Sequence, residues 1–204
     1  MSLFFIVLVS CTSHEKLSYQ ELIKWVNDSK NGLCSSHERK EISFRAVYMP
    51  SPLLASKEMR SQNAKGKKIY DSLVTQYDTE YTFVVTLAPV SDKPNSDIMY
   101  KDIDNKEEYK KRFLEMNFDL KNMFSLKIGD QIVQPEVYSF ENTYGLSKGR
   151  SIYLVFNKKQ FGPSSEKPSE LDLIFNDEVF NTGINHFVFP LDKINNIPEL
   201  DLNS

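Results

Sequence analysis

The pattern of short apolar runs from residue 117 onward constrains the fold more than any other feature. Short apolar and β-branched runs recur there, at Phe124–Ile128, Ile132–Phe140, Ser151–Phe156, Leu171–Phe175 and His186–Phe189. Glycine, proline and Asn-Asp turn signals separate these runs. Several short strands divided by turns predict an antiparallel sandwich or barrel.

The first half of the chain mixes helical and strand signals. Ser18 and Glu21 have the spacing of a capping box, and Asn31-Gly32 supplies a stop, so a short helix is expected between them. Alternation over 42–48 predicts a strand, and 81–87 reads as a buried strand.

Three further helices are expected in this half. Residues 53–78 read as two helical pieces interrupted at Gly66, with Ile69, Leu73 and Tyr77 facing inward. Residues 106–116 read as a charged amphipathic helix whose apolar stripe is formed by Tyr109, Phe113 and Met116.

These patterns predict a β-rich α+β protein. With 204 residues, 40% hydrophobic and 26% charged, the chain has the composition of an ordinary folded protein of one domain or two small ones. We expect an α+β region at 19–116 packed on a β-sandwich at 117–204. The strand pattern over 118–200 resembles the immunoglobulin-like domains of small, uncharacterised bacterial envelope proteins. The Cys pair of antibody domains is missing there, and Trp25 lies outside it.

The N-terminus carries the clearest signal of location. Leu3 to Val9 form an unbroken apolar run, too short to span a bilayer but long enough for the core of a signal peptide. The sequence Leu8-Val9-Ser10-Cys11 that ends it resembles the lipobox of bacterial lipoproteins. No Lys or Arg precedes the run, unlike in most signal peptides. The alternative is a buried strand that ends in an ordinary cysteine.

The lipobox resemblance implies a signal peptide at 1–10, acyl chains on Cys11 and a lipidated tether at 11–18. Two or more acyl chains anchor a protein stably. Thr12 stands where an aspartate marks inner-membrane retention in the best-known sorting systems, so the resemblance implies the outer membrane rather than the inner one. Cys34 would then lack a disulfide partner, and we expect it to be buried and inert.

Composition argues against several functions. A net charge of -3 gives no electrostatic footprint for nucleic acid, and 7 Gly leave little for phosphate-binding loops. Three His and two Cys leave little for zinc or haem, so we expect no cofactor or metal. Asp97, Asp102 and Asp104 share one loop, where calcium is an alternative, although the EF-hand pattern is missing.

One motif imitates a hydrolase. Gly145 to Gly149 match G-x-S-x-G around Ser147, and Asp172, Asp177 and His186 follow in the order of an α/β-hydrolase. That chemistry needs the serine on a strand-to-helix turn, whereas a strand-like run follows here. We therefore interpret the motif as a loop between two strands.

Trp25 and the lysine clusters each allow two interpretations. Trp25 stands on the first predicted helix, where packing at the edge of the core is favoured over a sugar-stacking platform. Lys65, Lys67 and Lys68, like Lys110 to Arg112, are expected on solvated helix faces, with contact to anionic lipid headgroups as the alternative.

The sequence thus predicts a membrane-anchored envelope lipoprotein that acts without catalysis, as a binding or structural module with a protein partner. The alternatives are an envelope hydrolase with an unrecognised site and a glycan- or peptide-binding lipoprotein. A polar cleft would favour an enzyme, and an exposed apolar patch or open sheet edge would favour a partner module.

Overall fold

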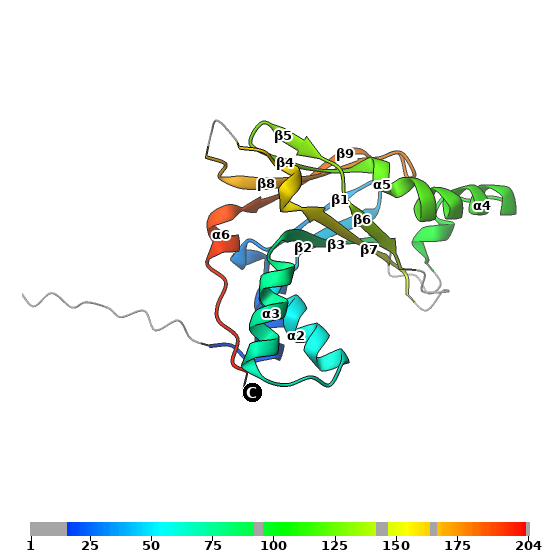
Figure 1. Cartoon of the computed structure of the whole chain (residues 1–204). Coiled ribbons are helices and arrows are strands. Elements are labelled where there is room, and N and C mark those ends of the chain that lie inside the picture. Colours follow the sequence, from blue (N-terminus) through cyan, green and yellow to red (C-terminus); the bar gives the residue numbers. More distant parts are fainter. Residues whose placement is uncertain (1–15, 92–95, 142–146, 164–166, 203–204) are drawn as a thin grey trace, which may run out of the picture.

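The protein is an α+β structure built on two antiparallel sheets (Figure 1). The computed structural model describes residues 16–91, 96–141, 147–163 and 167–202. The five-stranded sheet has the order β1-β2-β3-β7-β6, with strands at Cys34–Arg39, Ile42–Tyr48, Glu80–Pro89, Arg150–Asn157 and Val137–Phe140, respectively. The four-stranded sheet has the order β5-β4-β8-β9, with strands at Gln131–Val133, Phe124–Ile128, Glu170–Asp177 and Gly183–Pro190.

Helices cover the outer face of the five-stranded sheet. They are α1 (Tyr19–Asn27), α2 (Ser51–Ser61) and α3 (Lys67–Tyr77), with α2 and α3 below that sheet in Figure 1. Lys57 of α2 lies over the ring of Tyr153 on β7, and Arg45 of β2 donates a 2.6 Å hydrogen bond to Asn27 Oδ1 at the end of α1. The outer face of the four-stranded sheet has no such helical layer among the described residues.

The remaining helical segments lie at the ends of the sheets. One continuous stretch runs through α4 (Lys106–Leu114), the π-helical turn η3 (Glu115–Asp119) and α5 (Leu120–Met123), and its first part projects from one end of the molecule (Figure 1). The 3-10 turns are η1 (Ser29–Asn31), η2 (Ile98–Tyr100) and η4 (Lys158–Gln160), and α6 (Leu191–Asn195) follows β9. Within the described residues, none of the helices combines the length and apolar character needed to cross a bilayer.

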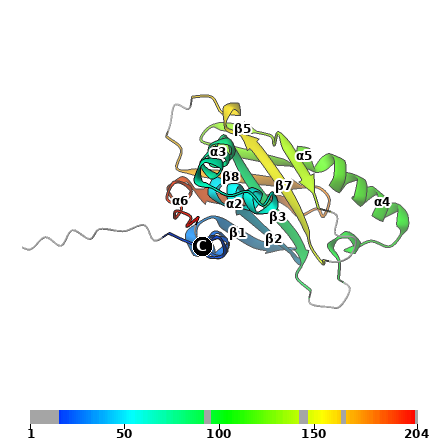
Figure 2. The ribbon, with the colours of Figure 1, turned by 60° about the horizontal axis from the view of Figure 1, so that its bottom comes forward.

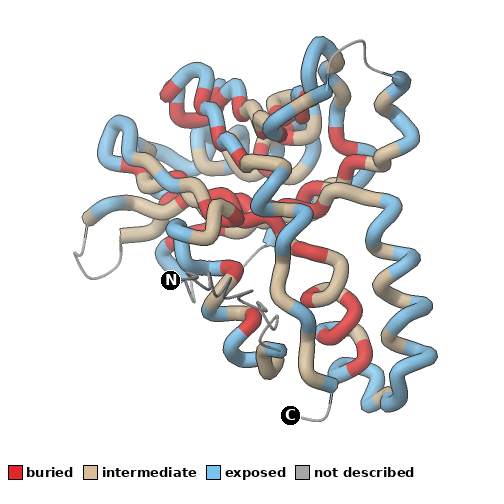
Figure 3. The backbone as a smooth tube through the Cα atoms, turned by 90° about the vertical axis from the view of Figure 1, so that its left-hand side faces the viewer, coloured by how far each residue is buried: buried red, intermediate tan, exposed pale blue. Residues whose placement is uncertain are grey.

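Aromatic side chains join the two sheets. The Phe83 ring on β3 lies 5.2 Å from that of Phe189 on β9, and the Phe44 ring on β2 lies 6.3 Å from that of Phe175 on β8. All four side chains are fully buried. Figure 3 shows the buried residues gathered along the strands in the middle of the molecule. Hydrophobic burial between the sheets therefore holds the two halves of the molecule together.

Local sequence signals explain most of the elements. The Ser18–Glu21 capping box forms as expected, and Gly32 ends the following turn with φ 76°, a conformation that glycine adopts without strain. The predicted strands over 42–48 and 81–87 are confirmed as β2 and β3. Every strand-like run of the second half also forms a strand, although the run over 132–140 is divided into β5 and β6 around Pro135.

The predicted division at residues 116 and 117 does not coincide with the sheets. β3 from the first region pairs with β7 from the second, from Glu80 opposite Asn157 to Leu87 opposite Arg150. β6 extends the same sheet on the far side of β7. Residues 117–204 therefore supply only part of the sandwich, because the five-stranded sheet takes three of its strands from the first region.

The helix α3 differs from the sequence prediction. Ile69 was expected to face inward, but 44% of its surface is exposed, and α3 has no fully buried residue. This helix packs on α2, where the Tyr77 hydroxyl donates a hydrogen bond to Glu58. It therefore forms an outer layer on α2 and contributes little to the core.

Candidate functional site

The expected lipid-attachment residue, Cys11, lies outside the described residues. The described chain begins at Lys16, and Leu17 N–H donates a 2.8 Å hydrogen bond to Glu199 C=O while Asp201 N–H donates to Leu17 C=O. The start of the body is thus fixed against the C-terminal segment. Cys34 is buried, as predicted, and it forms no disulfide within the described residues.

The hydrolase-like residues do not assemble around Ser147. Ser147 lies just before β7 in the five-stranded sheet, where its Oγ accepts a 3.3 Å hydrogen bond from Gly149 N–H. His186 lies on β9 in the other sheet, and its side chain points away from the five-stranded sheet because its buried neighbour Phe187 faces it. A strand follows the motif, so the interpretation of Ser147 as part of a loop between strands is confirmed.

His186 and Asp172 do meet, but on the outer face of the four-stranded sheet. His186 Nδ1 lies 2.8 Å from Asp172 Oδ2, and 53% of the His186 side chain is exposed. Asp172 Oδ1 is buried without a hydrogen-bond partner among the described residues. The pair orients the imidazole on an exposed face of the sheet.

Asp177 has a structural role at the turn between β8 and β9. Its Oδ1 accepts hydrogen bonds from the N–H groups of Val179 (3.1 Å) and Phe180 (3.0 Å). Its Oδ2 accepts from the N–H group (3.1 Å) and the hydroxyl of Thr182. A carboxylate that accepts this many hydrogen bonds fixes the turn.

The acidic loop does not form a calcium site in the described residues. Asp97 accepts a 2.7 Å charge-assisted hydrogen bond from Arg150, whose side chain is only 3% exposed. Asp102 pairs with Lys101 at 3.4 Å. Nowhere in 16–91, 96–141, 147–163 or 167–202 do three or more His, Cys, Asp or Glu side chains gather as a metal ion would require.

Two exposed apolar side chains lie on the helical stretch that contacts β6. They are Leu114 (43% exposed) and Phe118 (67%), and we call these two residues the distal patch. Leu114 and Phe118 are four residues apart along the helix, and β6 contacts η3 through a hydrogen bond from the Tyr138 hydroxyl to Asn117 C=O. π-helical turns are rare and occur frequently at functional sites. The distal patch therefore combines a rare backbone conformation with strongly exposed apolar side chains.

The opposite side of α4 anchors it to the body. Arg112 donates hydrogen bonds to the carbonyls of Met99 and Lys101, and its guanidinium lies 4.8 Å over the ring of Phe180. Burial lowers the pKa of Arg112, which stays charged at neutral pH. Burial, and the neighbouring Tyr100, raise the pKa of Tyr109. The projecting helix is thus held by polar contacts on one side, and the distal patch lies on another.

The four-stranded sheet also exposes apolar residues. Ile132, Ile184 and Val188 are 60%, 54% and 42% exposed. Val188 lies opposite Asp172 in the strand register, and Ile132 lies opposite Lys127. Charged and ionisable side chains therefore interrupt this face, which makes it a weaker docking candidate than the distal patch.

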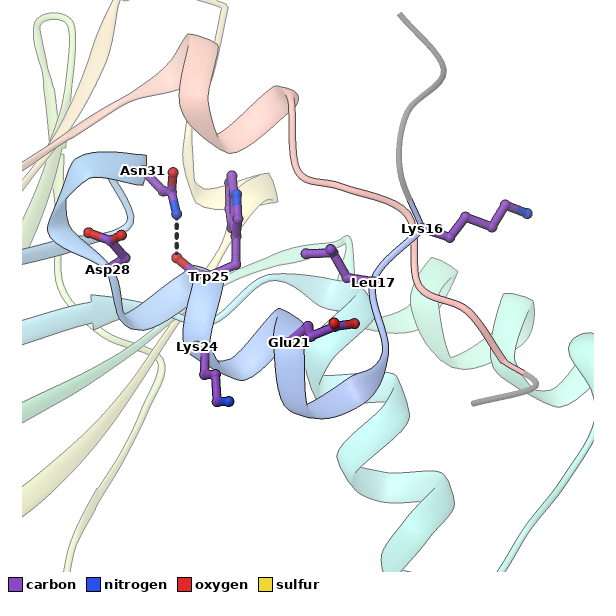
Figure 4. A pocket seen from close by; sticks show the side chains of 7 residues that line it. All are labelled: Lys16, Leu17, Glu21, Lys24, Trp25, Asp28 and Asn31. Carbon is purple, nitrogen blue, oxygen red and sulfur yellow. Dashed lines mark hydrogen bonds between the residues drawn. The ribbon is translucent and has the colours of Figure 1, made fainter.

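A shallow hollow of about 370 Å³ lies beside α1, where the chain enters the body (Figure 4). It is lined by Lys16, Leu17, Glu21, Lys24, Trp25, Asp28 and Asn31. Trp25 is half-buried and packs against the core, as predicted, but part of its indole also faces this hollow. The sequence indicated the tryptophan but not the hollow, because Asp28 and Asn31 reach it only through the turn that follows α1.

Comparisons with known proteins identify no family for the chain. No known protein family matches the sequence, and no curated protein matches it. Among solved structures, a crystal structure of a novel protein of unknown function from Burkholderia pseudomallei aligns over 94% of this chain and 100% of that chain, with a TM-score of 0.41 and 10% sequence identity. A similarity of this size supports no statement about the function of either protein.

Proposed function

We propose that this protein is a membrane-anchored lipoprotein of the cell envelope, acting as a non-catalytic binding module that docks a protein partner on the distal patch. The observation that carries this proposal is the exposure of Phe118, at 67%, on a π-helical turn beside β6, the last strand of its sheet among the described residues. Exposed apolar groups that gather next to unpaired backbone are typical of docking surfaces.

The position of the distal patch suits an anchored protein. Residue 16 and helix α4 lie at opposite ends of the molecule (Figures 1 and 2). Five peptide units separate Cys11 from Lys16, and at about 3.5 Å each they reach no farther than about 18 Å. Acyl chains on Cys11 would therefore hold the entry point of the body close to the bilayer, with the distal patch directed away from the membrane.

The end near residue 16 carries charges that suit a membrane surface. Lys65, Lys67 and Lys68 lie at the start of α3. Burial, then Asp71 and Glu199, raise the pKa of Tyr70 on α3 to about 12. Glu199 also pairs with Lys16 at 3.4 Å, so that end of α3 is close to the chain entry. Each basic side chain near an anionic bilayer contributes roughly 1 kcal/mol of attraction. We assign this end to the membrane, and the outer membrane in particular because Thr12 is not an aspartate.

Within the described parts of the chain, no strand pairs with the far edge of β6, and this edge indicates what kind of partner fits. Because Glu141 N–H donates to Ser151 C=O, the alternation of the antiparallel ladder turns the backbone groups of Tyr138 and Phe140 toward the free edge. An extended segment could add there as a further strand while one of its apolar side chains contacts Phe118. We therefore infer a partner that presents an extended apolar segment.

The immunoglobulin-like character of the sandwich is also a proposal. Two antiparallel sheets joined by aromatic residues support it. The contribution of β1, β2 and β3 means that such a sandwich would be assembled from both halves of the chain.

Photocrosslinking from the distal patch tests the proposed function. A photoreactive phenylalanine analogue at position 118 is expected to crosslink one envelope protein in intact cells. An analogue at position 114 should give the same product, because both positions lie on one stripe of the helix. Ile69 on α3 is the matched control, since it is 44% exposed but lies outside the patch.

Binding by purified proteins then decides the result. Phe118→Ser should weaken binding of the crosslinked protein about 30-fold, the effect of removing an aromatic residue that dominates an interface. Ile69→Ser should leave the affinity unchanged. Equal crosslinking from positions 69 and 118, or an affinity that Phe118→Ser does not alter, would reject the distal patch as the docking site.

A further inference from the structure

We propose that the hollow beside Trp25 binds a neutral saccharide, at a site separate from the distal patch. The hollow lies where the chain enters the body, at the other end of the molecule from α4 (Figures 1 and 4). A test of saccharide binding therefore does not depend on whether the proposed protein partner exists.

The indole of Trp25 provides the apolar surface that a sugar ring needs. Figure 4 shows it standing between Leu17 on one side and Asn31 and Asp28 on the other. Its packing against the core fixes its position, so little side-chain entropy is lost when a ligand stacks on it. The C–H groups on one face of a pyranose ring are weakly positive, and the face of an aromatic ring is negative, which makes the two surfaces complementary.

Polar groups around the indole are free to bind hydroxyls. Asn31 Nδ2 donates a 2.8 Å hydrogen bond to Trp25 C=O, which leaves Asn31 Oδ1 available as an acceptor. Asp28 Oδ1 accepts from Lys30 N–H at 3.0 Å, and Asp28 Oδ2 has no partner among the described residues. The Nε1 of Trp25 and the Nζ of Lys24 likewise have no hydrogen-bond partner in the described chain, so the lining of the hollow offers both donors and acceptors.

The charges of the hollow favour a neutral ligand. Lys16 and Lys24 are balanced by Glu21 and Asp28, all of them lining residues. Hydrogen bonds from Ser18 lower the pKa of Glu21 and keep it ionised. A site with no net charge does not select an anion or a cation. An apolar platform with a few oriented polar groups is the usual composition of a small-molecule site, and this hollow lies at the small end of the usual size range.

Tryptophan fluorescence tests this proposal cleanly, because Trp25 is the single tryptophan of the chain. The purified protein, in a detergent without a sugar headgroup, is titrated with tri-N-acetylchitotriose and with maltotriose. We expect a saturable shift of the emission to shorter wavelength with at least one of them, at a dissociation constant of roughly 1 mM, as suits a shallow site. Triglycine, a neutral peptide with similar polar groups, is expected to cause no shift.

Two variants and a control assign the signal to the hollow. Asp28→Asn retains the acceptor for Lys30 N–H but replaces the free carboxylate oxygen, and Asn31→Ala removes the amide. Each should weaken saccharide binding at least tenfold, whereas Ser29→Ala in the same turn should not change it. A misfolded variant would have an altered emission maximum before any ligand is added. The other variant would then be used to test whether the hollow binds the saccharide.

Three results would overturn the proposal. They are no emission change with either saccharide up to about 50 mM, some fifty times the expected dissociation constant; an unchanged affinity in Asp28→Asn; and a larger response to triglycine than to both saccharides. The last result would assign the hollow to peptides.

Discussion

Replacing Phe83 with alanine is expected to lower the free energy of unfolding by about 3–5 kcal/mol, the usual cost of truncating a fully buried phenylalanine. Phe83 is 0% exposed, and its ring lies 5.2 Å from Phe189 of the opposite sheet and 5.9 Å from Phe156 of the neighbouring strand. Alanine leaves a cavity between the two sheets, where neither can relax without losing contact with the other.

Urea denaturation followed by circular dichroism measures this loss. The exposed Phe118→Ala is the matched control, and it should stay within about 0.5 kcal/mol of the wild type because its side chain has little contact to lose. A double-mutant cycle with Phe189→Ala should show coupling of about 0.5–1.5 kcal/mol. A cost below about 1 kcal/mol for Phe83→Ala, without coupling to Phe189, would contradict the face-to-face packing of the sheets.

Asp177→Ala is expected to destabilise the protein by about 3 kcal/mol or more. The buried carboxylate accepts hydrogen bonds from three backbone N–H groups and the Thr182 hydroxyl, and its removal leaves these donors without partners in a buried turn. The effect should spread to β1, because Thr182 Oγ1 accepts from Asn185, whose Oδ1 lies 2.8 Å from His37 Nε2.

Thermal unfolding and hydrogen exchange together test this role. A loss of about 3 kcal/mol lowers Tm by roughly 6–12 °C in a protein of this size. The amides of Val179, Phe180 and Thr182 should lose protection before the rest of the sheet does. Asp192→Ala removes an exposed carboxylate on α6 and should leave Tm nearly unchanged. If the two alanine variants had the same Tm, Asp177 would not be the residue that holds the turn.

The sequence predicts most of the strands because their apolar patterns are strong, but it misses β1. That strand reads Cys-Ser-Ser-His-Glu-Arg, without the apolar alternation of a half-buried strand. The turn into β2 is made by Lys40 and Glu41, both with positive φ, where Asn-Gly would have signalled a hairpin. Long-range contacts hold β1 instead, including the hydrogen bond between His37 and Asn185.

The five-stranded sheet crosses the predicted boundary at residue 116 for a related reason. Strand patterns specify which residues form strands but not which strands pair, and the pairing of β3 with β7 spans some seventy residues of chain. Such a pairing is decided by how the aromatic residues of both sheets pack together. The sequence changes at residue 117 from mixed helix and strand patterns to mostly strand patterns, because helices are inserted between the strands of the first region.

The candidate sites were only partly visible in the sequence. Trp25 was singled out, but the polar groups around it converge only through the turn at 28–31. Phe118 gave no signal, since the helical stripe of Tyr109, Phe113 and Met116 explained the expected core contacts of this helix. Phe118 is exposed because it lies on the outer side of a π-helical turn. The spacing of apolar residues along a sequence does not predict such a turn.

The proposed lipid on Cys11 would determine which end of the molecule faces the membrane and which proteins the distal patch could meet. The intact mass of the native protein from the membrane fraction, compared with that of Cys11→Ala, tests it most directly. We expect a mature chain that begins at Cys11 and carries the mass of two or three acyl chains, whereas Cys11→Ala should lack this added mass and leave the membrane fraction. A full-length, unmodified native protein in the soluble fraction would contradict the account, and residues 3–9 would then be expected to pack in the core.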